Sequence, residues 1–232
     1  MIPKNIDEKI LDLLYDLQTD FDISFEIKDI DYCEVFQKSK TATIYYNPKI
    51  VNSESIAHEL LHIWLKRFNY SIGNHIFLCT QSDKKLRKFL NKFLCDYIGS
   101  CCDHVKMYPK YLDMGYSPKE FLKNGLELKA SISDIKVIKL NFLGFYNSQS
   151  VNLFIGCLFS ILADHIKEND YTEHHKCLIK KDSKLYYIVC DFWNKWEVFD
   201  IDNIDPIYNS DLELADSFID GLTDWAKNKT FL

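Results

Sequence analysis

The chain has 232 residues, of which 47% are hydrophobic and 15% aromatic, with only 7 Gly and 5 Pro. This composition predicts a folded protein with a substantial core and argues against a disordered or repeat-rich chain. The formal net charge is −6 and no basic stripe is present, so we expect no nucleic-acid partner.

The N-terminal part is predicted to be a helix followed by three strands. Apolar residues recur at helical spacing in residues 5–17, which indicates an amphipathic helix. Residues 22–30, 32–37 and 41–46 are rich in β-branched and aromatic residues, as is typical of strands.

The most specific motif is His58-Glu59-Leu60-Leu61-His62, inside an apolar run that is predicted to be a helix over residues 53–68. On a helix, His58 and His62 are one turn apart on the same face, so both imidazoles can bind one metal ion. Glu59 lies beside them as the candidate general base for a water molecule activated by the metal. The alternative is a core helix that carries two hydrogen-bonded histidines.

The strand at 41–46 followed by this helix resembles the catalytic core of the zincin metallopeptidases. No histidine follows His62 at the metzincin spacing, so the resemblance is to the gluzincin and aspzincin branches, in which a second helix supplies the third ligand. Residues 102–116 resemble a segment of uncharacterised bacterial and phage zincin-like proteins. The resemblance covers roughly residues 40–125, and it implies a zinc-bound fold and a peptidase without identifying a substrate.

The third ligand is expected from a second helix, predicted over residues 83–107. At about 100° per residue, this helix and the residue after it carry one apolar stripe. The stripe consists of Leu86, Leu90, Phe93, Tyr97, Cys101, His104 and Tyr108. Its phase favours His104 as the third ligand, ahead of Asp103 on the flank and Asp96 as a weaker choice.

Tyr108 follows His104 by one helical turn. If His104 binds the metal, the Tyr108 hydroxyl is a candidate to stabilise the oxyanion that forms when a carbonyl is attacked, a role that Tyr or His has in zincins. The alternative is a buried aromatic residue at the end of the helix.

From about residue 130 the chain is predicted to be mostly helical, with helices over residues 151–166, 185–196 and 212–225. For residues 185–189 alone, a strand is the alternative. No linker separates this part from the rest. We therefore predict an α+β fold, with a zincin-like metal-binding core at 1–130. Residues 131–232 would be a helical elaboration that packs on the core and does not fold independently.

The chain is expected to be cytoplasmic, with no membrane association. Its N-terminal segment lacks the apolar core of a signal peptide, and its longest apolar run, residues 151–163, is too short to span a bilayer. The 8 cysteines form no Cys-x-x-Cys pair, so we expect reduced thiols in the core.

These predictions combine into one hypothesis of function. The chain is expected to be a zinc-dependent hydrolase, and more narrowly a peptidase that cleaves a specific protein or peptide. His58, His62 and either His104 or Asp103 would hold Zn²⁺, and Glu59 would accept a proton from the attacking water. The alternative is a non-catalytic module in which zinc stabilises a surface that binds a protein or peptide. The substrate and the oligomeric state are left open.

Overall fold

The computed structural model describes residues 2–3, 6–122, 127–204 and 210–232. Over these residues the fold is α+β, as predicted, and mostly helical, with nine α-helices and two three-stranded sheets. The internal contacts divide the chain into two compact units, which are described separately. The first unit comprises residues 1–68 and 106–127, and the second comprises residues 69–105 and 128–232.

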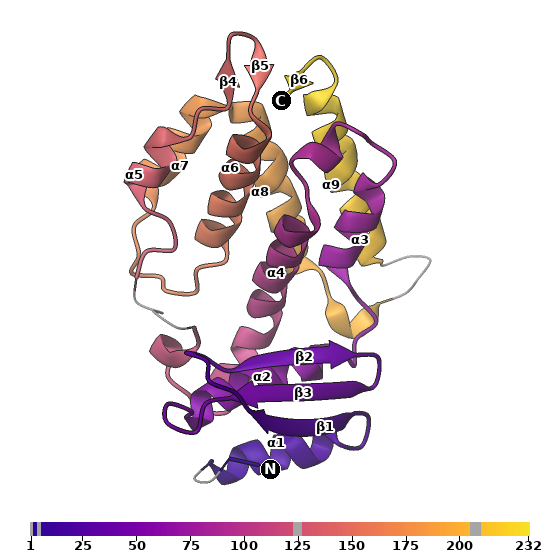
Figure 1. Ribbon diagram of the computed structural model, residues 1–232, viewed down its shortest axis with the longest axis vertical. Helices are drawn as coiled ribbons and strands as arrows, with labels where there is room; N and C mark the ends of the chain where they lie inside the picture. The colour runs from indigo at the N-terminus through magenta and orange to yellow at the C-terminus, as the bar shows by residue number, and fades with distance from the viewer. Residues whose placement is uncertain (1, 4–5, 123–126, 205–209) are drawn as a thin grey trace. The chain divides into compact units, whose positions relative to one another are not determined.

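The first unit is built on a small sheet. Its complete elements are α1 (Glu8–Leu17), β1 (Asp22–Ile27), β2 (Glu34–Lys38), β3 (Thr41–Tyr46) and α2 (Ser53–Leu65). The strand order is β1-β3-β2, with β1 parallel and β2 antiparallel to the central β3 (Figure 1). The N-terminal helix and the three strands predicted from the sequence are confirmed in the described residues, with bounds that differ by a few positions.

Side chains alternate along these strands between a buried and a more exposed face. Ile23 and Phe25 of β1 are buried, as are Ala42, Ile44 and Tyr46 of β3. A strand has a side-chain period of two, so this alternation leaves the sheet with one apolar face. Helix α2 packs against β2 and β3, and α1 packs against α2.

Helix α2, which carries the histidine motif, begins at a capping box. The Asn52 side chain accepts a 2.9 Å hydrogen bond from the Ser55 N–H, and the Ser55 hydroxyl oxygen accepts a 3.3 Å bond from the Asn52 N–H. These bonds satisfy backbone donors that an N-terminus leaves unpaired. The apolar side of α2 is buried through Ile56, Ala57, Leu60, Leu61, Ile63 and Leu65. The residues of the motif that carry charge or imidazole groups remain half-buried.

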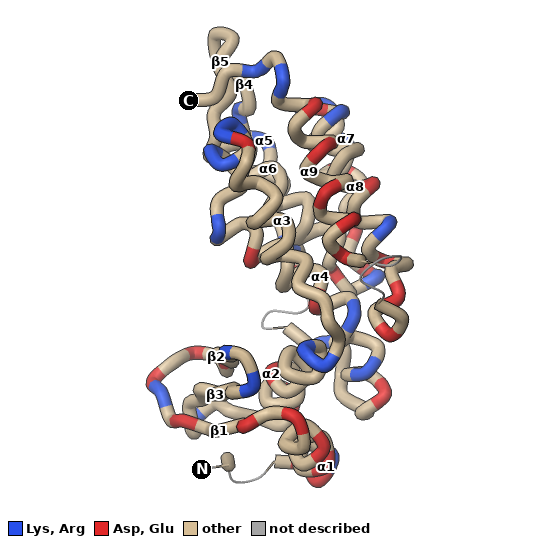
Figure 2. Tube along the Cα trace, turned by 90° about the vertical axis from the view of Figure 1, so that its right-hand side faces the viewer, with Lys and Arg blue, Asp and Glu red and all other residues tan. Residues whose placement is uncertain are grey.

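The second unit is mainly helical. Its elements are α3 (Ile72–Thr80), the first part of α4 (Lys92–Asp113), α5 (Ile132–Val137), α6 (Ser148–Leu162), α7 (Thr172–Lys181), α8 (Ser183–Val198) and α9 (Asp211–Ala226), with the strands β4 (Asn141–Phe142), β5 (Phe145–Tyr146) and β6 (Thr230–Phe231). The helices predicted in this half are confirmed as α6, α8 and α9. Asp and Glu residues lie along α8 and α9 (Figure 2).

The core of the second unit is aromatic. Trp193, Trp196, Trp225, Phe154 and Phe159 are almost completely buried. The rings of Phe159 and Trp193 meet edge to face with centroids 6.0 Å apart, a geometry that aromatic quadrupoles favour.

Two glycines let α3 and α4 approach closely. A Cβ added to Gly73 would lie 2.6 Å from the Cys95 carbonyl oxygen and 3.0 Å from the Gly99 Cα. Because both obstacles are backbone atoms, a side chain at Gly73 would force the two helices apart.

The predicted second helix at 83–107 is corrected in its bounds. Helix α4 runs from Lys92 to Asp113, and only a short 3-10 helix forms earlier, at Leu86–Lys88. The Asp83 carboxylate accepts hydrogen bonds from the N–H groups of Lys85 and Leu86. Such a local side-chain bond competes with a regular helix and holds a turn before α4 instead.

The predicted apolar stripe is also partly wrong. Cys101 is buried as predicted, but Phe93 and Tyr97 are exposed, whereas Leu94 and Ile98, which lie outside the predicted stripe, are buried. The buried side is therefore rotated relative to the predicted one along the N-terminal part of α4. The cause is packing against other elements, since a Cβ on Gly156 of α6 would lie 3.6 Å from Leu94.

Within the described residues, every helix is too short or too polar to cross a membrane. The cytoplasmic location stays a prediction. The boundary expected near residue 130 also stays a prediction, because contacts within a folded chain do not decide which segment folds alone.

Candidate metal centre

Two imidazoles of the candidate centre come from α2. His58 and His62 are separated by one helical turn, and their ring centroids lie 5.0 Å apart with an interplanar angle of 72°. Neither side chain is fully buried. The i, i+4 spacing therefore places two nitrogen donors on one helical face, as the sequence predicted.

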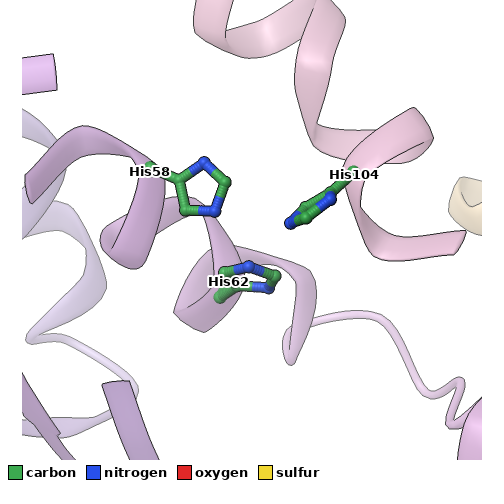
Figure 3. A group of neighbouring side chains, drawn as sticks. All are labelled: His58, His62 and His104. Carbon is green, nitrogen blue, oxygen red and sulfur yellow. The ribbon is translucent and has the colours of Figure 1, made fainter. Parts of the chain in front are cut away.

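The third imidazole comes from α4. The ligand atoms of His58, His62 and His104 all lie within 4.8 Å of one another. Figure 3 shows a nitrogen of the His104 ring directed toward the space beside the other two rings. His104 lies on α4 two residues before Lys106, where the chain returns to the first unit, and the helix is continuous through this point. Among the residues that the structure describes, no other set of three His, Cys, Asp or Glu side chains meets in this way.

The donor set suits a zinc ion. Zinc binds imidazole nitrogen at about 2.0–2.1 Å in tetrahedral geometry, which puts two such nitrogens roughly 3.4 Å apart. The three ligand atoms lie within 4.8 Å of one another, so zinc binding would bring them closer by at most about 1–1.5 Å. Small rotations about the side-chain torsions provide such a movement. Three protein ligands leave the fourth position of a tetrahedral site open, whereas structural zinc sites have four protein ligands.

Glu59 is the acidic group of the motif, and it is half-buried. Burial of the carboxyl raises its pKa to about 7, and the charge of Glu34 adds to this rise. His62 and the backbone N–H of Val35 act in the opposite direction. A divalent cation bound nearby would also lower the pKa, since it stabilises the carboxylate. The Val35 N–H of β2 is therefore the backbone donor that favours the carboxylate form of Glu59.

His58 and Glu59 line a cavity of about 810 Å³ within the first unit. Cys33 and Ser55 form part of its wall, where the Cys33 thiol donates a 3.4 Å hydrogen bond to the Ser55 hydroxyl. Burial raises the pKa of the Cys33 thiol, so the thiol stays protonated at neutral pH. A protonated thiol is a poor nucleophile, which assigns Cys33 to the wall of the cavity.

Phe121 is the central aromatic contact of this wall. The centroid of its ring lies 5.0 Å from the ring centroid of His58, 4.9 Å from that of Tyr108 and 5.0 Å from that of Tyr111. Phe121 is buried, so it fixes one side of the His58 ring. Tyr108 is thus brought next to a residue that contacts the candidate centre, and its role as an oxyanion donor stays a prediction.

Asp103 is not part of the three-histidine group. Its Oδ1 accepts a 3.0 Å hydrogen bond from the Tyr70 hydroxyl. Of the two alternatives for the third ligand, the structure therefore brings His104 together with the pair on α2, while Asp103 has a hydrogen-bonding partner elsewhere.

The sequence did not predict the cavity or most of its wall. Cys33, Ser55 and Phe121 carry no motif that sets them apart, and Phe121 is distant in sequence from the histidines on α2.

Comparisons with protein-family models, with curated proteins and with solved structures find no match for this chain. The fold and the site together define an α+β protein with a candidate metal centre of three histidines. Any closer functional statement depends on the chemistry of these side chains.

Proposed function

We propose that this chain is a zinc-dependent hydrolase with a zincin-like core, acting as a peptidase on a specific protein or peptide. The observation that carries the proposal is the meeting of His58, His62 and His104 within 4.8 Å. The candidate base Glu59 is adjacent in the same helix and lines the same cavity as His58.

The ligand number favours catalysis over a structural role. His58, His62 and His104 would hold the ion and leave a position for water or substrate. A zinc ion in such a site supplies a Lewis acid and makes water nucleophilic near neutral pH. A purely structural centre has no use for a carboxylate beside it, and Glu59 supplies one.

Glu59 would move the proton. Its carboxylate would accept a proton from the water that attacks the peptide carbonyl, and then return that proton to the nitrogen of the leaving amine. The contact with the Val35 N–H orients the carboxylate for this transfer. Tyr108 would donate a hydrogen bond to the oxyanion if its hydroxyl turns toward the substrate.

A peptide suits the surroundings of the site. β2 is an edge strand of its sheet, and extended peptides can pair with such an edge. The cavity of about 810 Å³ lies within the size range of pockets that enclose a small ligand, and such a pocket can receive part of a peptide. Its lining combines apolar groups such as Ile50 and Leu122 with carboxylates such as Glu120.

The test combines metal analysis with cleavage. Purified wild-type protein should contain about one zinc per chain, and His58→Ala should lose it. Glu59→Gln should retain zinc but produce none of the cleavages that the wild type produces in a peptide library or a proteome extract. Glu54→Gln is the matched control, because Glu54 lies one turn earlier on α2 and should leave zinc and cleavage unchanged.

A wild type without zinc would refute the metal centre. If the wild type and Glu59→Gln both contain zinc and give identical peptide products, the catalytic role of Glu59 is refuted. Zinc-dependent capture of peptides without any cleavage would instead identify the non-catalytic binding module.

A further inference from the structure

The hairpin of β4 and β5 has an unusual residue at its turn. Phe142 pairs with Phe145, and the two residues between them have positive φ angles, 51° for Leu143 and 84° for Gly144. Such two-residue turns favour Asn-Gly or Gly-Gly, because a bulky side chain is disfavoured at positive φ. Leu143 therefore occupies its position at a conformational cost.

The same turn exposes large apolar side chains. Phe142 is 69% exposed, Leu143 is 81% exposed, and Phe145 is also exposed. Figures 1 and 2 both show the turn extending beyond the neighbouring helices of the second unit. Val137, ahead of the hairpin, and Leu232, which follows the paired strand β6, are exposed as well. Phe142, Leu143 and Phe145 are neighbours in one turn, and grouped apolar side chains mark an interaction surface more often than scattered ones do.

Lysines surround this hairpin, although the whole chain is acidic. The ammonium of Lys181 bonds to the carbonyls of Lys136 and Ile138, and that of Lys88 bonds to the carbonyl of Phe231. Lys229 lies 5.0 Å from the centroid of the Tyr146 ring. These contacts are to carbonyl oxygens and a ring rather than to carboxylates, and the carboxylate whose charge acts on Lys229 is that of Asp182.

Further lysines and few acids lie in the same segments. Lys136 and Lys139 are exposed just before β4, and Lys227 is exposed just before β6. The hairpin from Lys139 to Asn147 contains no Asp or Glu. The nearby Asp182 accepts a 2.9 Å bond from the Trp225 indole and another from the Leu185 N–H at the start of α8.

We propose that this end of the second unit docks onto an anionic membrane surface. Phe142 and Leu143 would enter the boundary between headgroups and acyl chains, and the surrounding lysines would lie at the level of the phosphates. The side chain of Leu143 then has a use that accounts for its costly backbone conformation. This proposal is independent of the proposed hydrolase function. It differs from the expectation of no membrane association, because it proposes that the chain binds reversibly to the membrane surface without spanning the bilayer.

Lipid is favoured over other anionic partners by the shape and chemistry of the tip. Leu143 is more exposed than Phe142 or Phe145, and an aliphatic side chain cannot stack on a base as the aromatic platforms that bind single-stranded nucleic acids do. A projecting apolar turn ringed by lysines instead combines the two signals that stable peripheral binding requires.

The experiment is sedimentation of the full chain with vesicles. Wild-type protein should bind phosphatidylcholine vesicles that contain about 30% phosphatidylserine, bind poorly to pure phosphatidylcholine, and dissociate at about 0.5 M salt. Leu143→Asn should weaken binding by about tenfold, because it removes the inserted side chain. The double change Lys136→Gln with Lys139→Gln should weaken it about 25-fold, at about fivefold for each charge.

Leu143→Asn also separates binding from folding. Asn tolerates positive φ and Asn-Gly suits this turn, so the melting temperature should stay the same or rise. Val198→Asn is the matched control, because Val198 is 83% exposed at the far end of α8 and should leave vesicle binding unchanged.

Four outcomes would overturn the proposal. One is a wild type that does not sediment with the anionic vesicles, and another is a Leu143→Asn protein that binds them as well as the wild type. The third is a dimer that Leu143→Asn dissociates, which would show that a second copy of the chain covers the patch. Preferential binding of the wild type to an oligonucleotide over the anionic vesicles would likewise refute it.

Discussion

The hydroxyl of Tyr70 donates a 3.0 Å hydrogen bond to Oδ1 of Asp103, the residue immediately before His104. The preceding residue is also held, since the Trp196 indole donates a 3.1 Å bond to the carbonyl oxygen of Cys102. The rings of Tyr70 and Trp196 meet with centroids 5.5 Å apart. Burial and the charge of Asp103 raise the pKa of Tyr70, so its hydroxyl remains a donor at neutral pH. Two contacts therefore hold α4 at the turn that carries His104.

We predict that Tyr70→Phe weakens zinc binding by roughly tenfold, the low end of the effect of outer partners of a metal site. The ring contact with Trp196 is kept, but the bond that orients Asp103 is lost. Competition with a chromophoric chelator measures the zinc affinity directly. Asp103→Asn should retain most of the affinity, because an amide oxygen can still accept the bond from Tyr70.

The control is Tyr186→Phe, which removes a hydroxyl that bonds to His175 elsewhere in the second unit. It should leave the zinc affinity unchanged. Equal affinities in Tyr70→Phe and the wild type would show that α4 needs no support at this point, without affecting the case for the three histidines.

We also predict a clear difference between the two alternatives for the third ligand. His104→Ala should lower zinc affinity by about a hundredfold or more, since one of three donors is lost. Asp103→Asn should change it by less than about threefold, because Asp103 lies outside the histidine group. Calorimetric titration of the metal-free proteins measures both values, and the reverse ranking would make Asp103 the ligand.

Removal of zinc should lower the stability of the folded chain. A ligand that binds only the folded state, at about 100 times its dissociation constant, stabilises it by about 2.7 kcal/mol. Melting with zinc and with a chelator should therefore differ by several degrees. The chelator should have no effect on His58→Ala, and a similar shift in that variant would place the responsible metal elsewhere.

The close approach of α3 and α4 gives a prediction for stability. Gly73→Ala should lower the free energy of unfolding by about 1–3 kcal/mol, since the new methyl group meets backbone atoms. Gly156→Ala is the matched control, because its methyl group would meet only Leu94 at an ordinary 3.6 Å and helix propensity favours alanine. Chemical denaturation measures both changes. Equal stability of Gly73→Ala and the wild type would mean that the helices separate without loss.

Sequence patterns located the elements whose signal is local and strong. Strand β3 was predicted with its observed bounds, because it is rich in β-branched and aromatic residues. Helix α7 was not predicted, since its sequence is mostly polar and only His174 and Leu178 are buried. The strands of the second sheet have two residues each, too few for a periodic signal.

The start of α4 shows where local reasoning failed. Phe93 and Tyr97 are apolar and aromatic at helical spacing, yet they are exposed. The close crossing at Gly73 and Gly99 turns a different side of α4 toward the core. Burial of a helix face depends on which neighbours pack against it, and that information is not contained in the helix itself.

The sequence by itself determined the α+β class, the pairing of His58 with His62 and the position of Glu59 between them. These follow from helical geometry over a single turn, which neighbouring elements do not alter. Only the tertiary structure decided that His104 rather than Asp103 joins the two histidines, and that Phe121 and Cys33 form the wall of the cavity. Those residues are distant in the chain, so their meeting depends on how whole elements pack and not on the pattern within any one of them.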